Sequence, residues 1–181
     1  MGNRFVISDT HFGHAKMLTF LKSDGKTPIR PFTSVEEMDE VMIQNWNSVV
    51  RKDAGDVVIH LGDVTFDYKK YLTQIRPRLN GTIQLIVGNH DDMMNAEFMA
   101  SFKKVQFWKP LKEHAIFAAH LPMMPSQFRG KCTRQVHGHI HDKHVRDYGD
   151  YPKKPLWACV SVEHTNYTPV HIDELDKYFT L

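Results

Sequence analysis

Three short apolar runs, each followed directly by a polar cluster, constrain the fold of this chain most. The runs cover residues 4–8, 56–61 and 82–87, and their β-branched content predicts buried strands. The first and second runs are separated by a segment in which apolar residues recur at helical spacing, from Ser34 to about Arg51. Buried strands that alternate with amphipathic helices are typical of an α/β protein.

The second half of the chain has more strand-like segments than helices. Helices are expected over residues 68–75 and 93–102. Strand-like segments then follow at residues 114–119, 133–136, 156–162 and 168–172. This change predicts an α/β fold with a mixed sheet or two stacked sheets. Because we find no internal repeat, low-complexity tract or linker, we expect residues 1–181 to form a single domain.

Composition excludes several classes of protein. With 41% hydrophobic and 24% charged residues, the chain is neither disordered nor fibrous. Its apolar runs are far shorter than a membrane span, and its first residues resemble a strand rather than a secretion signal. We therefore expect a cytoplasmic protein with no membrane partner. The net charge of +2 is too small to indicate nucleic-acid binding, and the oligomeric state is left open.

Side chains that bind metals follow the predicted strands. In chain order the clusters are Asp9-x-His11, Gly62-Asp63, Gly88-Asn89-His90-Asp91, His120 and Gly138-His139-x-His141. In open α/β sheets, sites form outside the carboxyl ends of the strands. Carboxylate, imidazole and amide ligands suit Mn, Fe, Zn or Ni, whereas imidazole argues against Mg or Ca alone. The two cysteines form no CxxC motif, which excludes a typical thiolate zinc site.

Each cluster taken singly has an ordinary structural explanation. Gly62-Asp63 and the polar residues after Gly88 are typical of turns, and His139-x-His141 is also a pattern of solvated surface histidines. The conjunction is more specific than its parts, because complementary ligand types recur at the end of successive predicted strands. We therefore interpret the clusters as one metal site.

In this order, the clusters resemble the signature of the calcineurin-like metallophosphoesterase superfamily. The tail at residues 160–175 and the stretch at residues 30–47 resemble its small single-domain bacterial and phage members. The resemblance implies a four-layer α/β/β/α sandwich, in which two mixed β-sheets are flanked by helices. It also implies a centre of two divalent metal ions at one edge of the sheets.

The resemblance further assigns roles to individual side chains. The first metal would be held by Asp9, His11, Asp63 and His141, and the second by Asp63, Asn89, His120 and His139. We expect manganese first, with iron, zinc or nickel as alternatives. His90 would be an acid/base residue that does not bind metal. Asp91 or Asp67 is the candidate to orient it, because Phe66 occupies the position of the aspartate found in phosphatase relatives. His14 and Arg30 are candidates for substrate binding.

The expected function is metal-dependent hydrolysis of phosphodiester or phosphomonoester bonds by metal-activated hydroxide attack. The substrate would be a small phosphoester or a nucleotide-like compound. Nucleic acid is not favoured, because dedicated nucleases of this superfamily carry added domains that grip DNA. Two alternatives stay open: a non-catalytic scaffold of the same fold that binds a protein partner, and a small nuclease. The loops at residues 23–33 and 122–131 are expected to select the substrate.

Overall fold

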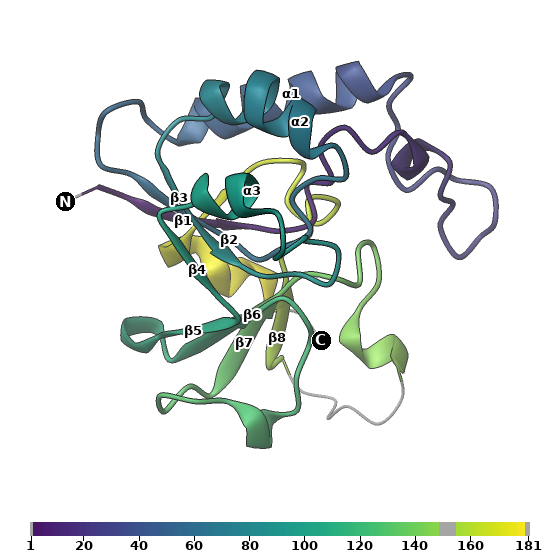
Figure 1. Ribbon diagram of the computed structural model, residues 1–181. Helices are drawn as coiled ribbons and strands as arrows, with labels where there is room; N and C mark the ends of the chain where they lie inside the picture. The colour runs from purple at the N-terminus through teal and green to yellow at the C-terminus, as the bar shows by residue number, and fades with distance from the viewer. Residues whose placement is uncertain (1, 149–154, 180–181) are drawn as a thin grey trace.

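The computed structural model describes residues 2–148 and 155–179. Two β-sheets are stacked on each other, and helices cover the outside of one of them (Figure 1). The strand order is β4-β3-β2-β1-β9 in the first sheet and β5-β6-β7-β8 in the second. The strands are β1 (Arg4–Ile7), β2 (Val57–His60), β3 (Thr82–Ile86), β4 (Lys104–Gln106), β5 (Trp108–Leu111), β6 (Ile116–Ala119), β7 (Arg134–His137), β8 (Trp157–Cys159) and β9 (Val170–His171).

Both sheets are mixed, as predicted. In the first sheet β1, β2, β3 and β4 are parallel and β9 is antiparallel to β1. In the second sheet β6, β7 and β8 are parallel and β5 is antiparallel to β6. The parallel strands of each sheet therefore end side by side, which brings the loops that follow them together.

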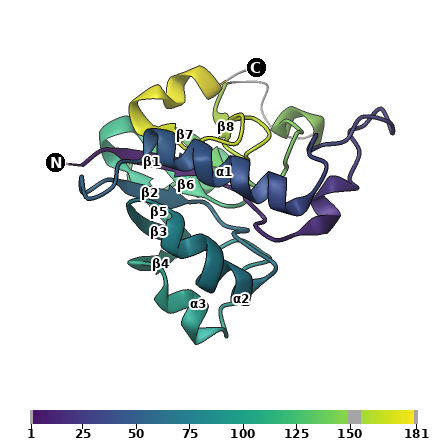
Figure 2. The ribbon, with the colours of Figure 1, turned by 90° about the horizontal axis from the view of Figure 1, so that it is seen from above.

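Helices cover the outer face of the five-stranded sheet, as the view from above shows (Figure 2). They are α1 (Val35–Val49), α2 (Tyr68–Lys70), which continues into a π-helical turn η2 (Tyr71–Ile75), and α3 (Ala96–Ala100). The remaining helical segments are short 3₁₀ turns. These are η1 (Ala15–Leu18), η3 (Arg76–Arg78), η4 (Lys112–His114), η5 (Pro125–Gln127), η6 (Val145–Tyr148) and η7 (Ile172–Tyr178).

The layer on the far side of the four-stranded sheet is thinner. There Phe117 of β6 stacks on Phe128, which follows η5, with ring centroids 5.7 Å apart. Val145 of η6 packs in one cluster with Trp157 of β8. The expected fourth layer is therefore built from 3₁₀ turns and loops, whereas α-helices form the first layer.

The longest helix, α1, begins where its sequence predicts. The Ser34 hydroxyl accepts a hydrogen bond from the backbone N–H of Glu37, 3.1 Å away, which caps the helix. Met38, Met42 and Trp46 follow at intervals of four residues and are almost completely buried. This stripe packs against Phe5 and other side chains on one face of the sheet.

Strand residues alternate between two cores. Ile7 joins the core beneath the helices, whereas its neighbour Val6 joins the core between the sheets, together with Ile59 and Ile116. Leu175 of η7 closes the second core. Both strand faces are thus filled, which holds the strand ends rigidly beneath the loops that follow.

Some elements differ from those expected. The helix predicted over residues 93–102 is limited to α3, and the strand predicted over residues 156–162 is limited to β8. Strands β4 and β5 were not expected, because β4 is short and polar and β5 contains Pro110. Both lie at sheet edges, where such residues are tolerated. In the described ranges, no helix has the length and apolar character needed to cross a bilayer.

Candidate metal centre

The loops after five strands bring the predicted ligands together. Asp9 and His11 follow β1, Asp63 follows β2, Asn89 follows β3, His120 follows β6, and His139 and His141 follow β7. Within this set, two groups have ligand atoms that all lie within 4.8 Å of one another. The first group is Asp9, His11 and His141, and the second is Asp63, His120 and His139. Each group contains three of the four ligands that the resemblance implies for one metal; Asp63 is not part of the first group, and Asn89 is not part of the second.

Asp63 lies between the two groups. Its Oδ2 atom is 3.8 Å from Nε2 of His11 in the first group and 3.5 Å from Nε2 of His120 in the second. Its other oxygen, Oδ1, accepts a hydrogen bond of 2.9 Å from the backbone N–H of His90. One carboxylate oxygen therefore faces imidazole nitrogens of both groups, which is the arrangement that a bridging ligand needs.

Buried acceptor atoms in the first group lack partners. Oδ2 of Asp9 accepts hydrogen bonds from the Ser161 hydroxyl and from the backbone N–H of His139, both at 2.9 Å. Oδ1 of Asp9 and both ring nitrogens of His11 are buried without a hydrogen-bond partner among the described residues. Unpaired buried polar atoms are costly, and a bound cation would satisfy Oδ1 of Asp9 and one ring nitrogen of His11. The donor set therefore fits a divalent metal.

His120 gives a second, independent sign. Its Nδ1–H donates to the Leu61 carbonyl over 2.6 Å, and this bond orients the ring so that Nε2 faces the other candidate ligands. This Nε2 faces Oδ1 of Asn89 at 2.9 Å as well as the Asp63 carboxylate. An imidazole nitrogen, an amide oxygen and a carboxylate oxygen that converge in this way are a common set of metal ligands. The His120 environment therefore also fits a metal.

Glycines allow the ligand loops to approach this closely. A Cβ atom on Gly88 would collide with the Asp63 carboxylate, and one on Gly138 would collide with Ser8 and the Asp9 carboxylate. Any side chain at these two positions would push the loops apart. The glycines beside the clusters thus have a steric role that can be named.

Five of the candidate ligands have left-handed backbones. The φ angles are +57° at Asp9, +48° at His11, +57° at Asp63, +72° at His139 and +51° at His141. Residues other than glycine rarely adopt this conformation, which costs roughly 1–2 kcal/mol per residue. Backbone strain of this kind is concentrated at functional sites, where the surrounding structure enforces it.

Glu163 and Arg30 support the first group from below. Oε1 of Glu163 accepts hydrogen bonds from Nδ1 of His141 at 3.1 Å and from Nε of Arg30 at 2.8 Å. The Arg30 guanidinium also donates to the backbone carbonyls of Asp9 and Thr10. Arg30 is completely buried, so the expectation that it binds substrate is corrected: its charge holds Glu163 and the ligand loop after β1.

Charge and burial set the protonation of these groups. Burial acts to raise the pKa of Glu163, but Arg30 and His141 outweigh it and hold this pKa at about 2. Burial likewise opposes protonation of His141, yet the bond to Glu163 raises its pKa above the ordinary value. Burial raises the pKa of Asp63 to about 6, and the Asp9 carboxylate adds to this effect. A cation beside Asp63 would favour its ionised form instead.

Glu163 was missed as a functional residue from the sequence. The sequence around Glu163 shows no spacing typical of metal ligands, because Glu163 acts on His141, which lies 22 residues earlier in the chain. The available signal was the tail at residues 160–175, which contains Glu163 and resembles the tail of small relatives. A carboxylate that holds the second nitrogen of a metal-binding histidine is a common support in metal sites.

His90 is exposed and lies beside the candidate metal centre. Its backbone carbonyl accepts a hydrogen bond of 3.0 Å from the Tyr68 hydroxyl, and its ring lies 6.0 Å from that of His11. The nearest aromatic ring is Phe66, with centroids 4.9 Å apart. Among the described residues, His90 is not part of either ligand group, and its role as an acid/base residue stays a prediction.

Asp91 and Asp67 do not orient His90. The Asp91 carboxylate is buried and accepts hydrogen bonds from the backbone N–H groups of Asp63, Val64 and Gly88. Asp67 caps α2 by accepting from the N–H of Lys70. The expected catalytic role of Asp91 is corrected accordingly: it fastens the loop after β2 to the loop after β3.

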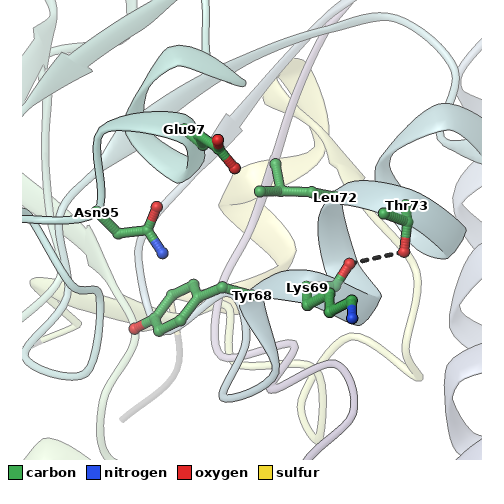
Figure 3. A pocket seen from close by; sticks show the side chains of 6 residues that line it. All are labelled: Tyr68, Lys69, Leu72, Thr73, Asn95 and Glu97. Carbon is green, nitrogen blue, oxygen red and sulfur yellow. Dashed lines mark hydrogen bonds between the residues drawn. The ribbon is translucent and has the colours of Figure 1, made fainter.

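His14 lies beside the centre and remains a candidate for substrate contact. Its ring stacks on Phe66 with centroids 3.9 Å apart and lies 5.5 Å from the ring of His11. A separate pocket of about 570 Å³ lies between the helical segment at residues 68–73 and the start of α3 (Figure 3). It is lined by Tyr68, Lys69, Leu72, Thr73, Asn95 and Glu97. None of the candidate ligands lines this pocket, and its Tyr68 hydroxyl donates to the His90 carbonyl.

Comparisons with known proteins show which family the chain belongs to. The chain is 34% identical over 177 residues to an uncharacterized protein of Methanocaldococcus jannaschii, covering 96% of this chain and 89% of that protein. It is similar to the crystal structure of a protein of unknown function from Aquifex aeolicus, with a TM-score of 0.70 and 26% identity. That match covers 98% of this chain and 99% of the other. The model of the calcineurin-like phosphoesterase family matches residues 4–161, and the chain therefore belongs to this family.

Proposed function

We propose that this protein hydrolyses small phosphodiesters or phosphomonoesters, including nucleotide-like compounds, with two divalent metal ions. Membership of the family supports a metal-dependent phosphoesterase in general. The observation that carries the proposal is Oδ2 of Asp63, which faces Nε2 of His11 at 3.8 Å and Nε2 of His120 at 3.5 Å. A carboxylate in this position would join two metal sites into one reaction centre.

When bound, the two ions would supply a nucleophile at neutral pH and neutralise charge on the phosphoryl group. The residues of the chain that would hold them are Asp9, His11, Asp63, Asn89, His120, His139 and His141. We propose manganese first, because mixed oxygen and nitrogen ligands without thiolate suit it, with iron, zinc and nickel as alternatives. Arg30 and Glu163 would orient the His141 ring toward its ion.

His90 would donate a proton to the departing alcohol. Its exposed imidazole lies beside the first group, and its backbone is held at both ends, by the Asp63 carboxylate and by the Tyr68 hydroxyl. A leaving alkoxide requires a proton, and imidazole has an ordinary pKa close to neutral pH. His90 is therefore the residue that we propose as general acid.

The test compares two substrates in the variant His90→Ala. The variant should keep both metals but lose roughly 10²–10⁴-fold in turnover of an alkyl diester, the usual contribution of general acid catalysis. The loss should be much smaller for a nitrophenyl diester, because nitrophenolate departs without a proton. His114→Ala is the matched control. His114 precedes β6, whereas His120 follows it, so His114 lies at the other end of this strand from the centre. Equal losses on both esters would assign His90 to electrostatic stabilisation, and full activity on both would remove it from the mechanism.

The alternative of a non-catalytic scaffold is not favoured, because the chain carries two groups of candidate ligands and Oδ2 of Asp63 also faces His11 of the first group. Nothing in the site favours a nuclease over an enzyme for small substrates. We further propose that residues 1–181 act as one domain. The candidate ligands are spread from Asp9 to His141, and Glu163, which bonds to His141, lies in the C-terminal tail. A cytoplasmic location remains a prediction from the sequence.

A further inference from the structure

A half-exposed aromatic side chain, Phe66, lies at the mouth of the candidate metal centre. Its exposed fraction is 42%, and it belongs to none of the hydrophobic core clusters of the described residues. Phe66 follows the bridging Asp63 by three residues, in the loop after β2. Since the ring contributes little to any core, the stability of the fold does not explain why an aromatic side chain is exposed here.

Histidine rings of the centre surround Phe66 on one side. Its centroid is 3.9 Å from His14, 4.9 Å from His90 and 5.4 Å from His11. The planes of Phe66 and His14 differ by only 28°, and those of Phe66 and His11 by 23°. These ring contacts restrict the orientation of the phenyl ring, and its exposed part offers apolar surface beside the centre.

The position of this surface relates it to the ester group of a substrate. His11 has Nε2 near the Asp63 carboxylate, where a phosphoryl group would bind, and its ring contacts Phe66. His90, the proposed acid for the departing alcohol, contacts Phe66 as well. An organic group that extends from the ester oxygen toward His90 therefore meets the Phe66 ring.

We propose that Phe66 determines specificity by stacking on a planar aromatic group carried by the ester oxygen of the substrate; this inference rests on the proposed function. A planar group makes more contact with a flat ring than a bulky saturated group does, because the face of the group and the face of the ring can touch without a gap. The substrate class is then aryl or nucleoside-type phosphoesters rather than simple alkyl esters.

Phosphonates test this proposal by binding alone, without hydrolysis. Benzylphosphonate, cyclohexylmethylphosphonate and ethylphosphonate carry a CH₂ group in place of the ester oxygen and are not hydrolysed. Their dissociation constants would be measured by titration calorimetry on the manganese-loaded protein. The variants are Phe66→Ala and Phe66→Leu, with Phe107→Ala as control, because Phe107 is 64% exposed and lies between the edge strands β4 and β5.

We expect the wild type to bind benzylphosphonate about tenfold more tightly than ethylphosphonate, the size of a stacking contact. Phe66→Ala should reduce this ratio to about twofold or less, with unchanged affinity for ethylphosphonate. Phe66→Leu should bind the benzyl and cyclohexylmethyl compounds equally, because it keeps apolar contact but has no flat ring. Phe107→Ala should match the wild type.

Three outcomes would overturn the proposal. These are a benzyl-to-ethyl ratio near one in the wild type, the same ratio in wild type and Phe66→Ala, and an equal loss of affinity for all three compounds in Phe66→Ala. The last would mean that the ring supports the centre itself. Failure of ethylphosphonate to bind the manganese-loaded wild type would instead reject the proposed function, and the inference would fall with it.

Discussion

Glu163→Gln tests whether a buried charge beneath the ligands supports both the fold and the metal. The wild-type side chain is 4% exposed, and its Oε1 accepts hydrogen bonds from Nε of Arg30 and Nδ1 of His141. Glutamine has nearly the same shape but no negative charge. The substitution therefore leaves the buried guanidinium of Arg30 without its counter-charge and weakens the orientation of His141.

The size of the effect follows from the pKa of Glu163. This pKa is about 2 in the folded chain, against an ordinary value of 4.5. At about 1.4 kcal/mol per pH unit, the difference corresponds to roughly 3 kcal/mol of stability at pH 7. Breaking a buried ion pair by removing one partner costs a similar amount, about 3–5 kcal/mol. Because the folded pKa is lowered, this stabilisation is complete above pH 4.5 and is lost as the pH falls toward 2.

Urea unfolding of the metal-free protein is the assay for stability. Glu163→Gln should lower the free energy of unfolding by about 3 kcal/mol at pH 7, and by about 1 kcal/mol less at pH 3.5. Glu174→Gln is the matched control, since Glu174 is exposed and pairs with Lys177 on the surface, so its change should stay within about 0.5 kcal/mol. Metal titration should show affinity reduced about 10–100-fold for one ion. Unchanged stability at pH 7, or a loss that does not vary with pH, would refute the reasoning.

Two further predictions concern the metals. Asp63→Asn should lose both ions, whereas His141→Ala should mainly lose one, and elemental analysis that finds two ions in Asp63→Asn would contradict the bridging role. Metal uptake should weaken as the pH falls through the imidazole range, because histidine must be neutral to bind. His141 should be affected first, since Glu163 raises its pKa, whereas burial lowers the pKa of His11 well below the ordinary value. Equal uptake at pH 5 and pH 8 would contradict a histidine-rich site.

The strands that carry ligands could be predicted because their signal is local. The apolar run at residues 56–61, for example, becomes β2 and ends just before the Gly62-Asp63 turn. Parallel strands end at the same edge of a sheet, so the meeting of their loops follows from topology once the strands are known. The pattern of strands and helices restricted the fold to a mixed sheet or two stacked sheets, and the resemblance to the family indicated two mixed sheets.

The supporting residues could not be predicted, because their roles depend on burial. Arg30 looks like a loop arginine in the sequence, and only the structure shows that its guanidinium binds Glu163 and two backbone carbonyls. Asp91 follows His90 directly, which suggested a catalytic partner, yet its oxygens are occupied by three backbone N–H groups. A sequence states which groups are polar, but it does not state which way a side chain turns from its loop.

The left-handed backbones of the ligands make this centre a place where function and stability compete. At His139, with a φ of +72°, glycine would remove both the imidazole and the conformational cost, whereas alanine would remove only the imidazole. The metal-free His139→Gly protein should therefore be more stable than His139→Ala by about 1 kcal/mol. A selection for thermal stability alone would drift toward glycine at such positions and erode the centre. Laboratory evolution of this protein for stability should therefore hold these five residues constant.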